Sequence, residues 1–231
     1  MHLVIFDIDG TLTQTTNVDD QCFVQAFVDE LGLKGINSDW SRYPAVCDSG
    51  ITQNIFREYL GREPHFAEVT RLQRRFAVLL EEAYRQEPER FVGTPGAAQT
   101  IRALRHNADY GVAIATGGWQ LSALLKLEKA QIDIAGLPAA FADHGVTREA
   151  ILAAAMVMAR TKYRQPQFTQ VTYIGDGVWD VRTAKQLGIG FIGVAHGEKE
   201  TALRAAGATA IIQDFTDYDR FREVLEELRY G

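Results

Sequence analysis

The chain has 231 residues, enough for one large domain or for a core with a smaller insertion. Its net charge is −6 and it has no long basic run, which disfavours nucleic acid as a main partner because phosphate backbones are bound by clustered Lys and Arg. No apolar run approaches membrane-spanning length and no signal-peptide pattern opens the chain, so we expect a cytoplasmic protein without a membrane partner. Cys22 and Cys47 form no metal or redox pair and are expected to be buried apolar residues.

The first predicted element is a buried strand over residues 3–6, followed by Asp7 and Asp9. Two carboxylates two positions apart on an extended chain point the same way. Acids at the end of a buried strand are costly without a cation, and a divalent metal is the simplest partner because hard cations take oxygen ligands. The alternative is that the two Asp residues cap a turn, as short acidic side chains often do.

Residues 14–92 interrupt the alternation of strands and helices. Helical spacing of apolar residues predicts three helices, from Asn17 to Gly32, from Ile51 to Gly61 and from Phe66 to Ala83. No clear strand occurs between them, which indicates a helical insertion. The alternative, that these helices belong to the main core, is disfavoured because a crossover between parallel strands rarely needs so many residues.

The regular alternation resumes at Gly93. Thr94 is a good N-cap with Pro95 at the first helical position, and this helix leads to a strand over residues 111–115. The strand ends at Thr116-Gly117-Gly118, before a helix predicted over residues 119–129. A hydroxyl and two glycines at a helix N-terminus can hold an anion, although Thr116 can also serve as a simple helix cap.

Further strands are predicted at residues 139–142, 171–175, 188–195 and 208–213, and a last helix is expected to be capped by Thr216 or Asp217. The third of these strand predictions has Gly190 and Gly193 inside it. The strand ending at Gly175 runs into Asp176, with Asp180 four residues later. Three strand ends that carry hydroxyl, glycine and carboxylate groups predict a Rossmann-like parallel α/β sheet with helices on both faces and one site at its carboxyl edge.

The motifs resemble those of a known family. The stretch Asp7-Ile8-Asp9-Gly10-Thr11-Leu12-Thr13 resembles motif I of the haloacid dehalogenase superfamily of aspartyl-phosphate hydrolases, Thr116 resembles motif II, and Gly175 to Asp180 resembles motif IV. Order and spacing match over nearly the whole chain. The resemblance implies a core of residues 1–13 and 93–231 and a helical type-1 cap at residues 14–92, as in phosphoglycolate phosphatase and β-phosphoglucomutase relatives.

The resemblance also implies a reaction. The protein is expected to be a Mg²⁺-dependent phosphatase of a small phosphorylated metabolite, with Asp7 as the nucleophile and Asp9 as the general acid and base. Dehalogenases in the superfamily lack the second Asp, so its presence favours phosphoryl transfer. The expected metal residues are Asp7, Asp9 through its backbone carbonyl, Asp176 and, as a supporting group, Asp180. The expected phosphate-binding residues are Gly10, Thr116, Gly117 and Gly118.

The family's third motif is a cation, usually Lys, that braces the nucleophile and the phosphate. Arg148 opens the helix before motif IV and is our choice, and Lys162 near the far end of that helix is the alternative. Arg in place of Lys is a departure, because its guanidinium is planar and larger.

Residues of the insertion are expected to set specificity. The candidates for facing the site are Thr15, Thr16, Arg42, Asp48 and Ser49, and the two tryptophans that flank motifs, Trp119 and Trp179, either wall the pocket or pack beneath it. The oligomeric state is expected to be a monomer or a homodimer.

Three other functions are compatible with parts of the pattern. A sugar phosphomutase would use the same site, and a non-catalytic phospho-acceptor would also carry an Asp at a strand end. A phosphonate hydrolase would need a Lys of the cap as a Schiff base, and the insertion contains only Lys34.

Overall fold

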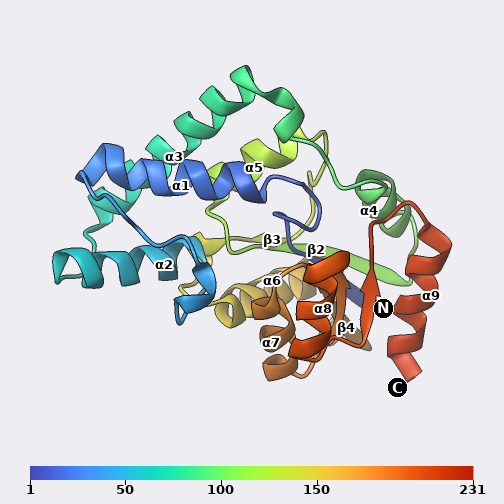
Figure 1. Cartoon of the computed structure of the whole chain (residues 1–231). Coiled ribbons are helices and arrows are strands. Elements are labelled where there is room, and N and C mark those ends of the chain that lie inside the picture. Colours follow the sequence, from blue (N-terminus) through green and yellow to red (C-terminus); the bar gives the residue numbers. More distant parts are fainter. Residues whose placement is uncertain (231) are drawn as a thin grey trace.

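The computed structural model describes the backbone of residues 1–230 and the side chains of residues 1–228. Its centre is a parallel sheet in the order β3-β2-β1-β4-β5-β6 (Figure 1). The strands are β1 (His2–Phe6), β2 (Tyr110–Ala115), β3 (Ala139–Ala140), β4 (Gln170–Gly175), β5 (Gly190–Val194) and β6 (Ala210–Ile212). In this order the connections reverse direction between β1 and β4, which is where open α/β sheets bind their ligands.

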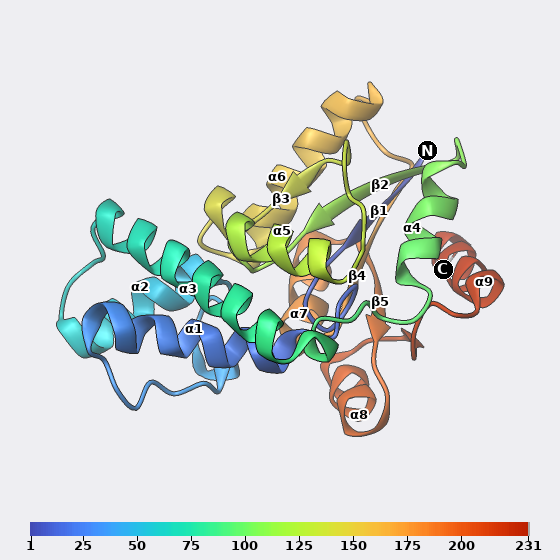
Figure 2. The ribbon, with the colours of Figure 1, turned by 90° about the horizontal axis from the view of Figure 1, so that it is seen from above.

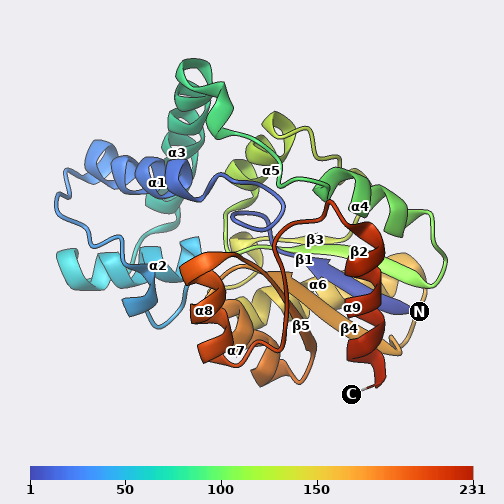
Figure 3. The ribbon, with the colours of Figure 1, turned by 45° about the vertical axis from the view of Figure 1, so that its right-hand side comes forward.

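Helices cover both faces of the sheet (Figure 3). One face carries α6 (Arg148–Tyr163), α7 (Val178–Leu187) and α8 (Gly197–Ala206), and the other carries α4 (Ala97–Arg105), α5 (Gln120–Lys129) and α9 (Tyr218–Tyr230). Successive side chains of β1 alternate between the faces, so that Leu3 and Ile5 join one apolar core while Val4 and Phe6 join the other. The predicted fold class is therefore confirmed.

Between β1 and α4 the chain forms helices that lie beside the carboxyl edge of the sheet (Figure 2). We call residues 14–92, which contain these helices, the helical insert, and the rest of the chain the sheet domain. The helical insert contains α1 (Thr16–Leu31), α2 (Asp48–Ile55), a π-helical turn (Phe56–Leu60) and α3 (Phe66–Gln86). Its two connections run side by side, since Gln14 N donates to Val92 O at 2.9 Å. Phe23 and Phe76 of the insert pack on Trp119 of the sheet domain, so one apolar cluster continues through both parts.

Short 3₁₀ helices also occur, at Trp40–Arg42, Pro88–Arg90 and Ala142–His144. Among the described residues, no helix has the length and apolar character needed to cross a membrane. Cys22 and Cys47 are buried and unpaired, as expected.

Some predicted boundaries are wrong. Helix α4 begins at Ala97 with Gly96 in the left-handed region at φ 78°, so Thr94 is not its N-cap and Pro95 is not its first residue. A Cβ at Gly96 would lie 2.1 Å from Phe215 O, and this tight contact with the segment after β6 moves the helix start. The strand expected over residues 139–142 lasts two residues before a 3₁₀ turn, and α8 was not predicted because only Leu203 is buried in it.

Candidate active site

Asp7 lies at the point where β1 leaves the sheet. Its backbone N–H still donates to Ile174 O of β4 at 2.9 Å, so the neighbouring strand fixes its position. The side chain is 2% exposed, and its Oδ1 atom has no hydrogen-bond partner in the described structure. Burial raises the pKa of this carboxyl to about 6, although the guanidinium of Arg148 opposes the rise. A buried carboxylate oxygen without a partner is a place for a ligand.

Gly10 allows the loop after β1 to meet the loop after β4. Its φ of 73° is in the left-handed region, and a Cβ there would lie 1.9 Å from Oδ2 of Asp176. Any side chain at this position would displace the carboxylate. The absence of a side chain at Gly10 therefore allows motif I to pack against motif IV.

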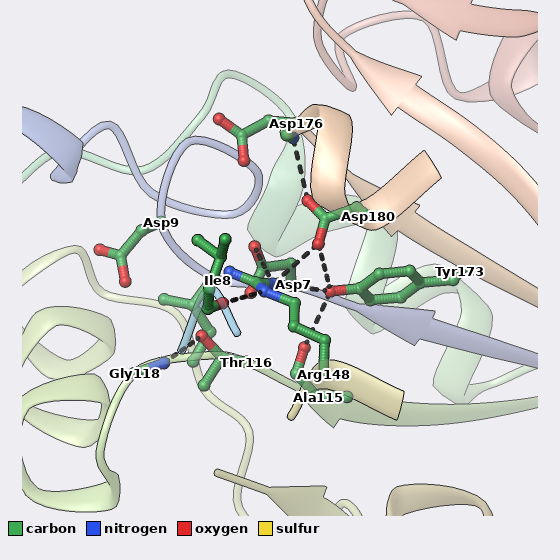
Figure 4. A network of polar contacts seen from close by, with 12 residues as sticks. Asp7, Ile8, Asp9, Ala115, Thr116, Gly118, Arg148, Tyr173, Asp176 and Asp180 are labelled. Carbon is green, nitrogen blue, oxygen red and sulfur yellow. Dashed lines mark hydrogen bonds and ion pairs between the residues drawn. The ribbon is translucent and has the colours of Figure 1, made fainter. Parts of the chain in front are cut away.

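Three carboxylates gather at the switch point of the sheet (Figure 4). Oxygen atoms of Asp7, Asp176 and Asp180 lie within 4.8 Å of one another, and all three side chains are buried. Burial raises the pKa of Asp176 to about 6, and the ammonium of Lys199 on α8 pairs with it. Asp180 is fully buried and accepts hydrogen bonds from Gly177 N at 2.9 Å and from the Tyr173 hydroxyl at 3.1 Å.

Arg148 supplies the positive charge at these carboxylates. Thr147 caps α6 by accepting from Ala150 N at 3.3 Å, which places Arg148 at the first helical position. Its Nη1 atom lies 2.8 Å from Asp180 Oδ1 and 3.4 Å from Asp7 Oδ2. Burial alone would lower the pKa of Arg148, but the two carboxylates raise it above its ordinary value.

The candidates for the third motif therefore differ in position. Arg148 contacts the nucleophile candidate, and its Nε donates to Val46 O of the insert at 2.8 Å. Lys162 is exposed near the C-terminus of α6. A Cβ at Gly117 would lie 2.7 Å from the Arg148 guanidinium, so this glycine leaves room for the larger cation.

Thr116, Gly117 and Gly118 follow β2 and line the same space. The Thr116 hydroxyl accepts from Gly118 N at 3.2 Å and thereby shapes the turn. It does not cap α5, because the N-cap position is Trp119. The first amide groups of α5 are satisfied by acids instead, Trp119 N by Asp48 at 2.8 Å and Gln120 N by Asp143 at 2.6 Å.

Asp9 lies apart from the three carboxylates, on the side of the helical insert (Figure 4). Its Oδ2 atom is 2.5 Å from Lys126 Nζ of α5, and its Oδ1 atom accepts from the Thr15 hydroxyl at 2.6 Å. Lys126 is fully buried and also pairs with Asp19 of α1. Burial alone would lower the pKa of Lys126, but these carboxylates raise it above its ordinary value.

Sequence reasoning missed Lys126. The signal was available, because Ala123, Lys126 and Leu127 recur at helical spacing on the buried face of α5. A lysine within such an apolar stripe needs a buried acid. The same reasoning missed Lys199, because its helix was not predicted.

A cavity of about 260 Å³ lies between the sheet edge and the helical insert. The sheet domain contributes its floor and the insert contributes its roof. The lining residues are Asp7, Asp9, Thr16, Asp19, Asp20, Phe23, Trp40, Val46, Cys47, Asp48, Ile51, Thr116, Gly117, Gly118, Arg148, Asp176, Trp179 and Lys199.

The specificity candidates differ in where the structure places them. Thr16 and Asp48 line the cavity, and Thr15 is buried against Asp9. Ser49 is turned to the sheet domain, where it donates to Ala142 O at 2.7 Å. Arg42 is exposed and lines a separate depression, so the expectation that it might face this site is wrong.

The two tryptophans differ as well. Trp179 walls the cavity, with the Arg148 guanidinium 5.8 Å from its ring centre. Trp119 is 1% exposed and packs beneath the site against Phe23.

Fold and site together define a protein with a parallel α/β sheet and a buried Asp at its switch point. The chain belongs to the haloacid dehalogenase-like hydrolases, since the model of that family matches residues 1–188. None of the curated proteins searched matches the chain.

Solved structures share the fold over nearly the whole chain. A hydrolase from Pseudomonas syringae is 22% identical with a TM-score of 0.72, and the match covers 96% of this chain and 98% of that one. A protein from Bacteroides vulgatus named as a β-phosphoglucomutase is 15% identical (TM-score 0.66, covering 100% and 91%). One from Haemophilus somnus named as a phosphoglycolate phosphatase is 17% identical (TM-score 0.60, covering 95% and 97%).

Proposed function

We propose that this hydrolase is a Mg²⁺-dependent phosphatase that acts on a small phosphorylated metabolite through an aspartyl-phosphate intermediate. The observation that carries the proposal is the carboxylate of Asp7, buried at the switch point with one oxygen free and Arg148 beside the other. A fixed nucleophile next to a fixed positive charge is what phosphoryl transfer requires.

The donor set fits Mg²⁺. Asp7 and Asp176 offer carboxylate oxygens, and the backbone carbonyl of Asp9 is the further ligand that we propose. Lys199 already places a positive charge on Asp176, which supports a role for this carboxylate in holding a cation. Asp180 bonds to Arg148, Tyr173 and Gly177 and would position its neighbours. When bound, Mg²⁺ would neutralise negative charge on the phosphoryl group.

In the first half of the proposed reaction, a carboxylate oxygen of Asp7 attacks phosphorus while the bond from phosphorus to the ester oxygen breaks. Asp9 gives its proton to that oxygen, and the alcohol leaves. In the second half, water attacks the phosphorus of the aspartyl phosphate and passes a proton to Asp9. The bond between Asp7 and phosphorus breaks, and inorganic phosphate is released.

The remaining residues have supporting roles in this proposal. Thr116, Gly117, Gly118 and Gly10 would contact phosphoryl oxygens, and Arg148 would contact both the nucleophile and the phosphoryl group. Lys126 and Thr15 hold the carboxylate of Asp9 between them. The helical insert, residues 14–92, would act as a cap that excludes water from the cavity.

The test is release of inorganic phosphate from a panel of phosphorylated metabolites, with and without Mg²⁺, by the wild-type protein and by Asp7→Asn. We expect the variant to lose at least about a thousandfold in rate with its fold intact, because an amide cannot form the anhydride. The matched control is Asp29→Asn, which makes the same change at an exposed position of α1.

Substantial turnover by Asp7→Asn would refute the nucleophile assignment. Conversion of a sugar phosphate to its isomer, without phosphate release, would indicate a phosphomutase instead. Stable phosphorylation of Asp7 without turnover would indicate a phospho-acceptor. A phosphonate hydrolase is not favoured, because Lys34 is exposed and does not line the cavity.

A further inference from the structure

The roof of the cavity is lined by acidic side chains and, among the described lining residues, by no lysine or arginine. The insert contributes Asp19, Asp20 and Asp48 to the lining, and neither a lysine nor an arginine. The cations of the lining, Arg148 and Lys199, come from the sheet domain and already contact carboxylates there. The half of the cavity that would hold the leaving group is therefore acidic.

One buried cation does not balance this acidic half. Lys126 lies behind it and pairs with Asp9 and Asp19. Four acidic side chains, those of Asp9, Asp19, Asp20 and Asp48, line this half of the cavity, and Lys126 forms ion pairs with Asp9 and Asp19. A substrate with a second anionic group would bring like charge into this space, which is unfavourable in a site of low dielectric.

Asp20 has an oxygen available for a ligand. Its Oδ1 atom accepts from Nε1 of Trp40 at 2.6 Å, and its Oδ2 atom has no hydrogen-bond partner in the described structure. Burial raises the pKa of Asp20, a sign that this carboxylate is partly desolvated without a matching positive charge. An ammonium group from a ligand would supply that charge.

Aromatic rings complete the roof. Trp40 meets Phe23 edge to face, with ring centres 5.7 Å apart, and both rings line the cavity. Aromatic faces attract cations, and a carboxylate beside them adds an acceptor for N–H donors. Asp19, Asp20, Phe23 and Trp40 therefore form an arrangement suited to a protonated amine.

We propose that the substrate is the phosphate monoester of a short amino alcohol, with its ammonium group held at Asp19, Asp20 and Trp40 while its phosphoryl group meets Asp7. The proposal rests on the proposed phosphatase function and deepens it. The cavity, at about 260 Å³, is below the range of roughly 300–1,000 Å³ typical of pockets for drug-sized ligands, which favours a short substrate.

The experiment compares three two-carbon esters that differ in one terminal group: 2-aminoethyl phosphate, ethyl phosphate and 2-phosphoglycolate. We expect kcat/KM for the amine to exceed that for the ethyl ester by about tenfold and that for the carboxylate by about a hundredfold or more. Equal values for the amine and ethyl esters, or a preference for the carboxylate, would overturn the proposal.

Asp20→Asn tests the assignment of the residue. We expect it to reduce the ratio of kcat/KM between the amine and ethyl esters about tenfold, because the charge is lost while the shape is kept. Asp29→Asn, the matched control on the same helix, should leave the ratio unchanged. A ratio that is unchanged in Asp20→Asn would contradict the role of this carboxylate.

Binding of the alcohol alone separates this inference from the proposed reaction. Ethanolamine should raise the melting temperature of the wild-type protein, whereas ethylene glycol and glycolate at the same concentration should not. If none of the three esters is hydrolysed and the metabolite panel is also inert, the phosphatase function fails, and the melting shift still decides the inference. Equal shifts with ethanolamine and ethylene glycol would overturn it.

Discussion

The floor and the roof of the cavity are both acidic, but their charges are balanced differently. On the floor, Arg148 and Lys199 stand against Asp7, Asp176 and Asp180, so each carboxylate has a cation within reach. On the side of the roof, Lys126 pairs with Asp9 and Asp19, whereas Asp20 and Asp48 line the cavity without an ion pair in the described structure. The floor is built on strand ends, whose positions the sheet fixes, and the roof on helices of the insert. A fixed floor suits the reaction shared by a family, whereas side chains on a helical roof can change with the substrate.

The substitution with the largest expected effect on stability is Lys126→Met. The change removes the buried cation that α5 places behind the roof and leaves Asp9 and Asp19 without their partner, and uncompensated buried charges of this kind cost about 3–5 kcal/mol. Urea denaturation at pH 7 measures the loss. The double variant Lys126→Met with Asp19→Asn should recover part of it, because one unpaired carboxylate is removed. A loss below about 1 kcal/mol would mean that the roof does not depend on Lys126.

A second test uses pH. Burial raises the pKa of Asp48 to about 7 from 3.8, so the folded state keeps this proton at pH values where the unfolded chain has lost it. This contribution to stability is fully present below pH 4 and is lost as the pH rises to 7, by up to roughly 4 kcal/mol. Asp48→Asn keeps an acceptor for Trp119 N and does not titrate. The variant should therefore gain stability relative to wild type between pH 4 and pH 8.

Urea denaturation of both proteins at pH 4, 6 and 8 measures that difference. The other buried acids are common to both proteins, so the change of the difference with pH reports the titration of Asp48 and its electrostatic effect on neighbouring acids. A constant difference across this range would show that Asp48 is ionised in the folded state throughout.

The smallest effect on stability is expected for a substitution on the floor of the cavity. Arg148→Lys keeps the positive charge but loses the planar group that reaches Val46 O, Tyr173 and Asp180 at once. We expect a loss of about 1–2 kcal/mol in stability, together with a lower kcat. Measurements of unfolding and of phosphate release on the same samples check both. Full activity in the variant would mean that the positive charge alone, without the planar guanidinium, is sufficient at this position.

The sequence predicted the parts of the molecule that rest on backbone patterns. The central strands, the gathering of Asp7 and Asp176 at their ends, and three helices in the insert all follow from local periodicity and from the parallel sheet. Arg148 was chosen as the cation of the third motif because it opens the helix before motif IV.

The roof was largely beyond sequence reasoning. Asp19 and Asp20 resemble the ordinary first-turn acids of a helix, and only the tertiary structure brings Asp19 to Lys126 of α5. Arg42 was an equally reasonable candidate, but the 3₁₀ turn at Trp40–Arg42 directs Trp40 to the cavity and leaves Arg42 exposed. Orientation of this kind depends on tertiary packing, which periodicity does not contain.

The start of α5 is completed by another part of the chain, since the acceptor for Trp119 N is the Asp48 carboxylate of the helical insert. Asp48 N in turn donates to Gly117 O at 2.7 Å. Any separation of α2 from α5 would leave both N–H groups without their acceptors. The hydrogen-exchange rates of these two amides therefore report how often the cavity opens to solvent, and they can be measured without any substrate.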